Sequence, residues 1–313
     1  MGALSHTARG IATAARRPWL VVFLWLTNSL LAGVAVLPVA ATLMRDLPSA
    51  PEADGLREGP ALGTVVEVMR DAPGTATATQ LASASALALA ALIGPFFAAG
   101  LVETLLSNDP RSLAHRFGRG AGHFGGRFLR AGVAAAVLAA VGAGLLATPW
   151  LAARHRLDET SHGYARWLLG LAAMAFAGLA VVVALRALDY ARLEIARRDD
   201  RRAIRQMWRA LVLVLRHPVR TLGVWVSNVL VLALVAAALY ALRRALPGST
   251  WPAILALVAA QQTFSLTRAG LRVALWSAEH GVLEDLSPLA PPAAPVPAPV
   301  PPTDAETETL QAS

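Results

Sequence analysis

Residues 221–242 form a run without a single charged side chain, directly after a segment rich in arginine. A helix of this length rises about 33 Å, which is enough to cross a hydrocarbon layer of roughly 30 Å. Such a helix is apolar on every side, so it favours a place inside a bilayer. The arginines that precede it favour the cytoplasmic side of that bilayer.

Similar apolar runs recur along the chain and predict its fold class. We expect an all-α, polytopic membrane protein with six transmembrane helices and an amphipathic cytoplasmic helix between spans 4 and 5. The predicted spans are residues 18–37, 81–106, 128–151, 167–188, 221–242 and 251–276. Residues 1–17 are then a cytoplasmic leader and residues 18–286 the membrane domain. Residues 287–313 are rich in proline and are expected to form a disordered cytoplasmic tail.

The composition agrees with a membrane protein and excludes several other classes. Charged residues make up only 15% of the chain, against about 25% in an average soluble domain. The net charge of +8 would suit a nucleic-acid partner, but the arginines lie in loops between apolar runs, so we expect no nucleic acid. The chain has no cysteine, which excludes disulfide bonds, thiolate catalysis and cysteine metal sites.

The distribution of arginine predicts how the protein sits in the membrane. With the N-terminus inside, 20 of the 28 arginines fall on the cytoplasmic side, whereas the opposite orientation would place them outside. The positive-inside rule favours the first arrangement. We therefore expect a multi-pass protein of the bacterial cytoplasmic (inner) membrane with both termini in the cytoplasm.

Two segments of the chain repeat each other at an offset of 200 residues. Arg16, Pro18, Trp25, Asn28 and Leu30 correspond to Arg216, Pro218, Trp225, Asn228 and Leu230. A weaker echo relates Ala99-Gly100-Leu101 to Ala269-Gly270-Leu271. The interpretation is a parallel repeat in which spans 1–2 and 5–6 are related pairs, and chance similarity between apolar helices is the alternative. A signal peptide at residues 18–37 is disfavoured, because the same pattern recurs inside the chain.

The segment before span 5 has the pattern of an amphipathic helix. Its apolar stripe consists of Ile204, Met207, Trp208, Leu211 and Leu215. Its basic side consists of Arg202, Arg205, Arg209 and Arg216. Such a helix can lie along the inner leaflet, with Arg202, Arg205, Trp208 and Arg209 at anionic headgroups. Packing against the cytoplasmic ends of the spans is equally compatible with the pattern.

Polar side chains inside the predicted spans are the candidate intramembrane site, because such groups are costly in a bilayer. The candidates are Asn28, Glu103, Asn228, Gln261, Gln262, Arg268 and Arg272. The two asparagines fall near the bilayer midplane, where a hydrogen bond between helices is the structural alternative. Arg268 and Arg272 share one helix face, and we expect Glu103 or Glu279 as their partner. The alternative is that both arginines reach the inner headgroups.

No pattern in the chain predicts a catalytic centre, a metal site or a cofactor. His115 and His123 lie eight residues apart in a glycine-rich loop, without a carboxylate at metal-ligand spacing. Arg186 and Asp189 lie three residues apart at the end of span 4, and the expected role of that pair is to cap the span.

Several short motifs lie between residues 97 and 218. They are Phe97-Ala98-Ala99-Gly100-Leu101, Phe124-Gly125-Gly126-Arg127-Phe128, Asp189-Tyr190-Ala191-Arg192, Asp200-Arg201-Arg202 and Arg216-His217-Pro218. Together they resemble uncharacterised six-span bacterial integral membrane proteins. This broad group includes YciC-like proteins and the membrane domain of glycerophosphodiester phosphodiesterases. The resemblance implies six helices and no known activity, since the soluble phosphodiesterase domain is not among the matching residues.

These observations lead to two function hypotheses. The first is a non-catalytic integral membrane protein that organises or regulates a membrane complex or the surrounding lipid. Its expected partners are the bilayer, the anionic headgroups and a protein at the cytoplasmic face. The alternative is a transporter or permease subunit for a lipid or small anionic solute, with a site at the interface of the repeats that consists of Asn28, Asn228, Gln261 and Arg268.

Overall fold

The computed structural model describes residues 2–46, 73–107, 112–157, 163–246 and 251–288, and this part of the chain folds into helices alone. The helices are α1 (Ala3–Arg16), α2 (Pro18–Asp46), α5 (Pro73–Leu106), α6 (Leu113–His155), α7 (Gly163–Arg198), α8 (Ala203–Arg216), α9 (Pro218–Ala245) and α10 (Trp251–Leu286). The all-α prediction is confirmed for these residues. The predicted tail lies almost wholly outside them.

Every predicted span lies within one helix, and the helices are longer than the predicted spans. Four of them are long and apolar enough to cross a membrane: Gln80–Leu106 within α5, and α6, α7 and α9. This number is smaller than the six predicted. The protein therefore has the helices of a membrane-embedded protein. The predicted spans 1 and 6, at residues 18–37 and 251–276, do not belong to these four long and apolar helices.

The two remaining helices, α2 and α10, fall short for different reasons. In α2 the apolar stretch whose side chains the structure describes is the shorter helix Pro18–Gly33. In α10 the polar side chains of Gln261, Gln262 and Arg268 interrupt the apolar run and lower its mean hydropathy. The prediction treated α10 as an ordinary span, although this helix carries most of the polar candidates.

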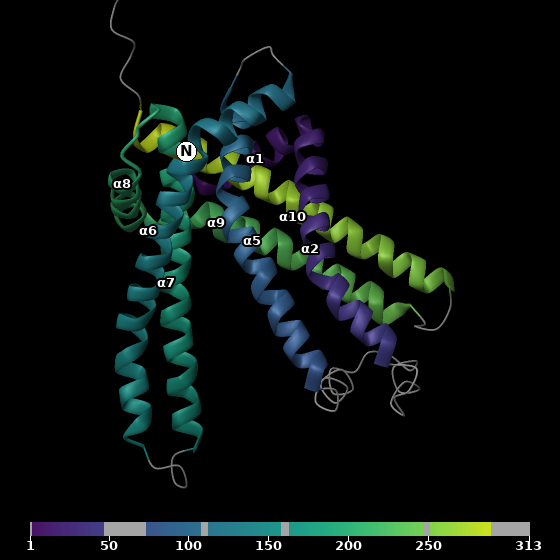
Figure 1. The fold of residues 1–313 in the computed structure, drawn as a ribbon. Helices are drawn as coiled ribbons and strands as arrows, with labels where there is room; N and C mark the ends of the chain where they lie inside the picture. Colours follow the sequence, from purple (N-terminus) through teal and green to yellow (C-terminus); the bar gives the residue numbers. More distant parts are fainter. Residues whose placement is uncertain (1, 47–72, 108–111, 158–162, 247–250, 289–313) are drawn as a thin grey trace, which may run out of the picture.

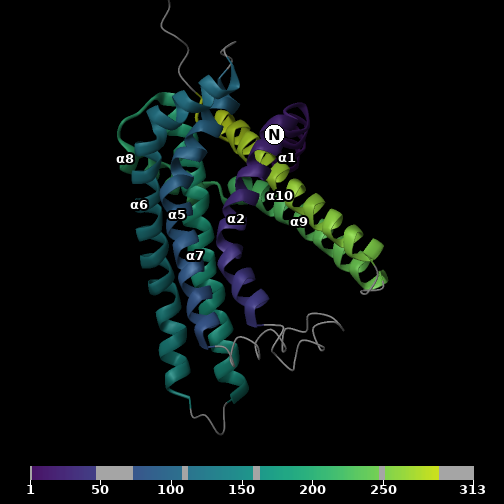
Figure 2. The same ribbon diagram turned by 45° about the vertical axis from the view of Figure 1, so that its right-hand side comes forward.

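The helices form two groups that diverge from a common end. In the first group α6 packs along α7, while α5 packs on α6 and α8 crosses α7. In the second group α9 and α10 form a hairpin covered by α1, and α2 lies between the groups against α5 and α10. Figure 1 shows the α6–α7 pair beside the α9–α10 hairpin, and Figure 2 shows that hairpin leaning away from α5, α6 and α7.

The buried core lies at the end where the two groups meet. There Phe128 of α6, Tyr190 and Leu193 of α7 and Met207 of α8 are fully buried. Toward the opposite end α6 exposes Val133 and then an apolar side chain at every fourth position, Val137, Val141 and Leu145. Positions four apart share one helix face. A continuous exposed apolar face of this kind fits contact with lipid.

The repeat at an offset of 200 has a counterpart in the backbone. The helices α1 and α8 both contain 14 residues. Each ends at a residue of the same conformation, Arg17 at φ −125°, ψ 56° and His217 at φ −127°, ψ 52°. A proline then begins the next helix, which suits proline because the first helical N–H needs no partner. Residues 1–17 were predicted only as a leader, so α1 was missed.

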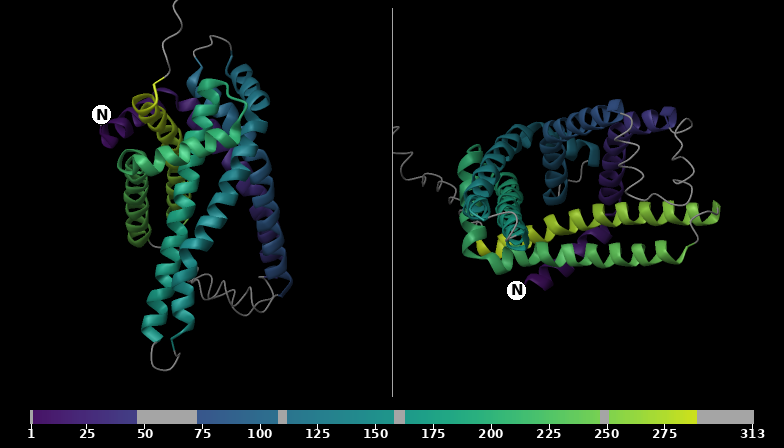
Figure 3. Two further views of the ribbon diagram at one scale, coloured as in Figure 1. Left: turned by 90° about the vertical axis from the view of Figure 1, so that its left-hand side faces the viewer. Right: turned by 90° about the horizontal axis from the view of Figure 1, so that it is seen from below.

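The two matching helices α1 and α8 lie at the same end of the molecule but on different groups. The helix α1 packs on α10 and α9, whereas α8 packs on α7 and α6. Figure 3 shows α8 crossing the long helices near the end where α10 also finishes. Each short helix therefore covers the end of one helix pair.

Close approach between α5 and α6 depends on Gly120, and we expect Gly120→Ala to destabilise the protein. A Cβ at this position would lie 2.7 Å from the carbonyl oxygen of Ala99 on α5. Such overpacking costs about 1–3 kcal/mol. Gly122 is the control, because a Cβ there meets nothing within 4 Å; Gly122→Ala should be neutral or stabilising by about 0.5–1 kcal/mol. Thermal unfolding in detergent micelles measures both, and equal unfolding temperatures would contradict this packing.

Candidate functional site

A buried carboxylate, Asp189, joins α7 to α10. Arg272 of α10 donates two hydrogen bonds to it, from Nη2 to Oδ1 at 2.9 Å and from Nη1 to Oδ2 at 3.2 Å. Arg186, which lies on α7 together with Asp189, is 2.9 Å from Oδ2. The indole N–H of Trp276 on α10 donates to Oδ1 at 3.4 Å. The paired geometry of Arg272 is the strong, directional form of this contact. Asp189 therefore fixes the crossing of two helices that share little other contact.

A second carboxylate, Glu279 of α10, completes the ion cluster. Arg186 donates to its Oε1 at 3.0 Å, and the Glu279 side chain is fully buried. Arg192 borders the cluster with Nη1 at 3.6 Å from Asp189. The spacing of these residues along the helices explains why they meet. Residues three or four apart share a helix face, so α7 and α10 each present a row of charged and indole groups to the other helix.

Two of the predicted partners are thereby corrected. Arg272 pairs with Asp189, and neither Glu103 nor Glu279 is its partner. Glu103 instead pairs with Arg119 of α6, since α5 and α6 are adjacent along their length. The predicted pair of Arg186 and Asp189 does form, but it belongs to a larger cluster. This larger cluster could not be read from the sequence, because its contacts join positions more than eighty residues apart.

A cavity of about 1030 Å³ lies beside this cluster, between α2, α5, α6, α7, α9 and α10. Its walls are mostly apolar. Its polar lining consists of Asn28, Arg192, Asn228, Arg268 and Arg272, with the indoles of Trp225 and Trp276. The cavity thus brings together four of the residues predicted as an intramembrane polar site. Gln261 and Gln262 are exposed on α10 and do not line it, and neither does Glu103.

Several polar atoms at this cavity lack a partner within the described part of the chain. The amide of Asn228 donates to the Val224 carbonyl at 2.9 Å, but its Oδ1 accepts nothing, although the residue is only 6% exposed. The Nε of Arg192 is likewise buried and unpaired. Arg268 makes no hydrogen bond or ion pair among the described residues, and it is exposed. Buried polar groups normally have partners, so the unpaired atoms of Asn228 and Arg192 are exceptions to that rule.

Arg192 was not among the predicted site residues. It lies one turn beyond the predicted end of span 4, within a row of arginines that all looked like loop charges. The available signal was its spacing of three residues from Asp189, which places both on neighbouring parts of one helix surface.

The helix α8 packs against the cytoplasmic ends of the predicted spans, which is one of the two arrangements that its pattern allowed. Its small residues face the long helices, where Ala203, Ala210 and Val214 are buried together with Gln206 and Met207. Ile204, Trp208 and Leu215 of the predicted apolar stripe are instead exposed. Arg202, Arg205 and Arg209 are exposed beside them. The helix thus packs on the bundle and still presents an apolar and basic surface that could contact headgroups.

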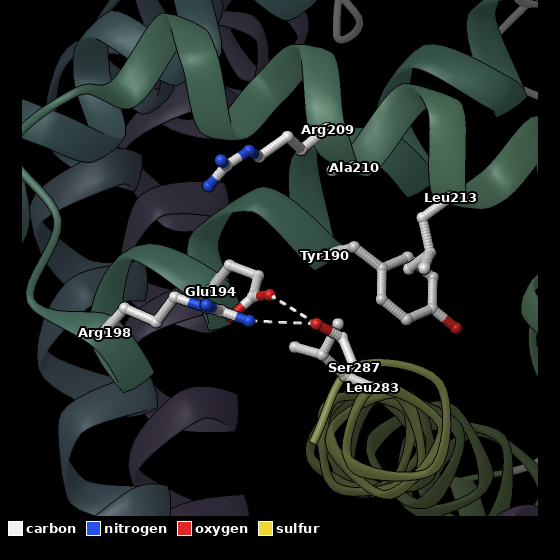
Figure 4. Close-up of a pocket in the computed structure, with 8 residues that line it drawn as sticks. All are labelled: Tyr190, Glu194, Arg198, Arg209, Ala210, Leu213, Leu283 and Ser287. Carbon is white, nitrogen blue, oxygen red and sulfur yellow. Dashed lines mark hydrogen bonds and ion pairs between the residues drawn. The ribbon is translucent and has the colours of Figure 1, made fainter. Parts of the chain in front are cut away.

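A smaller cavity of about 280 Å³ lies where α8 meets the ends of α7 and α10. Figure 4 shows Arg198 and Glu194 of α7 reaching the Ser287 hydroxyl, while Arg209 of α8 points toward them from above. Arg198 donates to that hydroxyl at 2.9 Å and to Glu194 at 2.9 Å. Arg198, Glu194 and Ser287 thus satisfy one another, whereas the Tyr190 hydroxyl has no partner among the described residues. This cavity is much smaller than the other one, and it is the weaker candidate.

The histidines considered as metal ligands lie apart from both cavities. His123 contacts Asp199 at 2.8 Å, beside Arg127. The hydrogen bonds from Arg127 and then from His123 hold the pKa of Asp199 below its usual value. Among the described residues, no group of three or more potential metal ligands comes together.

Comparison of the chain with protein-family models, with curated proteins and with solved structures found no match. The resemblance to YciC-like proteins and to the membrane domain of glycerophosphodiester phosphodiesterases therefore depends on the short motifs alone. The proposal of a function is therefore based on the cavity and the residues that line it.

We expect Asp189→Asn to be strongly destabilising. The substitution removes the charge that compensates Arg272 and Arg186, and uncompensated buried charges cost about 3–5 kcal/mol. Asp199→Asn is the matched control, because that carboxylate is mostly exposed and exposed ion pairs contribute only about 0–1 kcal/mol. Chemical unfolding in micelles compares the two. A loss for Asp189→Asn no larger than that of the control would show that the cluster does not hold α7 to α10.

Proposed function

We propose that this chain is a six-span protein of the bacterial cytoplasmic membrane that binds a lipid in its large cavity and so organises the surrounding bilayer without catalysis. In this proposal α2 and α10 are spans 1 and 6, beside the four helices that are long and apolar enough to cross. The described ends of the chain, in α1 and α10, lie at one end of the molecule (Figure 1). The arginine distribution supports a cytoplasmic location for that end.

The observation that carries this proposal is the composition and position of the large cavity. Leu87 of α5 and Val133 of α6 line it, yet they are 73% and 59% exposed. The cavity therefore opens sideways onto the apolar surface of the helices. An apolar wall open to hydrocarbon suits acyl chains, while the arginines at its other end suit a headgroup.

The position of the arginines along their helices agrees with such a ligand. Arg268 and Arg272 lie in the last third of the predicted span 6, on the side of the expected inner headgroups, and Arg192 lies just beyond span 4. Leu87 lies toward the opposite end of the predicted span 2, whereas Val133 lies in the inner half of span 3. A lipid of the inner leaflet has the same order, with a polar group at the interface and chains toward the centre.

A transporter or permease subunit is the second candidate. It is favoured by the location of the cavity between the repeated segments, because Asn28 and Asn228 both line it. Flux of a lipid or an anion through liposomes that contain the purified protein, lost in Arg268→Gln without loss of folding, would select this candidate. A protein partner at the exposed face of α8 is compatible with either function.

Filling the cavity should displace the bound lipid. Gly132 of α6 lines the cavity, and a Cβ there meets nothing within 4 Å, so Gly132→Trp adds bulk without a clash near the backbone. Gly144 lies on the same helix outside the cavity and is equally open. We expect the lipid retained by Gly132→Trp to fall about tenfold, the effect of roughly 1.4 kcal/mol.

Native mass spectrometry of the protein released from membranes measures the retained lipid. Gly144→Trp should retain as much lipid as the unmodified protein, because its indole lies outside the cavity. Equal retention by both variants would show that the cavity does not hold the lipid.

A further inference from the structure

Two of the guanidinium groups that line the large cavity, those of Arg192 and Arg268, have no carboxylate of their own. Arg186 is paired with Glu279 at 3.0 Å, and Arg272 is paired with both oxygens of Asp189. Arg192 has only a 3.6 Å contact with the same Asp189. Arg268 has no partner among the described residues. Four arginines thus share two carboxylates, which leaves an excess of two positive charges.

No other described acidic side chain can remove this excess. The remaining described carboxylates contact groups elsewhere: Glu103 with Arg119, Glu194 with Arg197 and Arg198, Asp199 with Arg127, Asp200 with Gln206, Glu284 with His280, and Asp285 with His6. Arg192 is nearly buried, and Arg268, although exposed on α10, lies within the predicted span 6. Unpaired charge is unfavourable in either place, since water does not solvate it as it would at the surface of a soluble protein. The site is therefore built for an anion from outside the described chain.

We propose that this end of the cavity selects the phosphate monoester headgroup of a lipid, held between Arg192 of α7 and Arg268 of α10. The inference rests on the proposed function, that the cavity holds a lipid. A phosphate monoester carries a charge of about −1.5 to −2 at neutral pH, whereas the phosphodiester of an ordinary phospholipid carries a single charge. Only the monoester matches the excess of two positive charges, and guanidinium groups bind phosphate oxygens in pairs.

Asn228 supplies a further contact of the right kind. Its amide nitrogen donates to Val224, and its buried Oδ1 has no partner among the described residues, although Asn228 itself lines the cavity. Only the singly protonated fraction of the monoester has a P–O–H group that can donate to such an oxygen, and that fraction carries one negative charge instead of two. A free phosphate ion has the same chemistry, but it would leave the apolar walls around Leu87 and Val133 without a ligand.

The test titrates the purified full chain with three phospholipids that have the same acyl chains, namely phosphatidic acid, phosphatidylglycerol and phosphatidylcholine, and separately with inorganic phosphate. Native mass spectrometry reports occupancy. We expect phosphatidic acid to bind about tenfold more tightly than phosphatidylglycerol, because one additional charge lies close to two guanidinium groups. Phosphatidylcholine should bind more weakly than either.

Two variants decide whether the arginines cause this selectivity. Arg268→Gln and Arg192→Gln should each reduce the preference for phosphatidic acid to about twofold or less, since each removes one of the two excess charges. Arg216→Gln removes a charge from the exposed end of α8, outside the cavity, and should leave the preference unchanged. Arg268 has no partner within the described residues, so its variant should also keep the unfolding temperature of the parent.

The possible failures are distinguishable. Equal binding of phosphatidic acid and phosphatidylglycerol, with both still displaced by Gly132→Trp, would overturn the headgroup inference and leave the proposed function intact. Displacement of phosphatidic acid by inorganic phosphate at equal concentration would identify a free anion as the ligand and overturn the lipid assignment. Lipid binding that is absent, or that is unaffected by Gly132→Trp, would overturn the proposed function and the inference together.

Discussion

The carboxylate of Asp189 is the contact on which the arrangement of the two helix groups depends. The groups meet through α2 and through the crossing of α7 with α10, where contact is otherwise small. At that crossing Asp189 binds Arg272 through both oxygens and also contacts Arg186 and Trp276. Apolar packing supplies little preference for one crossing between helices in lipid. The directional contacts of this single buried anion fix the point at which α10 crosses α7. That crossing in turn determines the space between the two helix groups.

That space becomes a cavity because the two groups diverge on the side away from Asp189. The repeated helix pairs contribute to this geometry. The helices α1 and α8 end in the same backbone conformation, at Arg17 and His217, so α2 and α9 leave them through similar bends. Because α1 covers α10 and α8 covers α7, each bend directs a long helix along the cavity. Asn28 and Asn228 therefore reach one cavity from two segments 200 residues apart.

Much of this fold follows from the sequence, and the site follows only in part. Uncharged runs predicted where the long helices lie, and the two asparagines related by the 200-residue offset, Asn28 and Asn228, line one cavity. The same offset places residues 3–16 opposite the helix at 203–216, so it contained the signal for α1. The partners of Arg186 and Arg272 could not be derived, because periodicity within a helix says nothing about which helix lies opposite. Arg192 was missed because an arginine just beyond a span resembles any other cytoplasmic charge until its neighbours are known.

The imbalance of charge at the cavity is a consequence of the helix spacing. On α7, Arg186, Asp189 and Arg192 follow at intervals of three residues, so one carboxylate lies between two guanidinium groups. On α10, Arg272 takes both oxygens of that carboxylate, while Glu279 lies two turns further on and reaches Arg186 instead. Both carboxylates are thus engaged by Arg186 and Arg272, whereas Arg192 and Arg268 line the cavity without a carboxylate of their own. A cluster that served only to join the helices would need neither of these two arginines, and this is the strongest structural reason to assign them to a ligand.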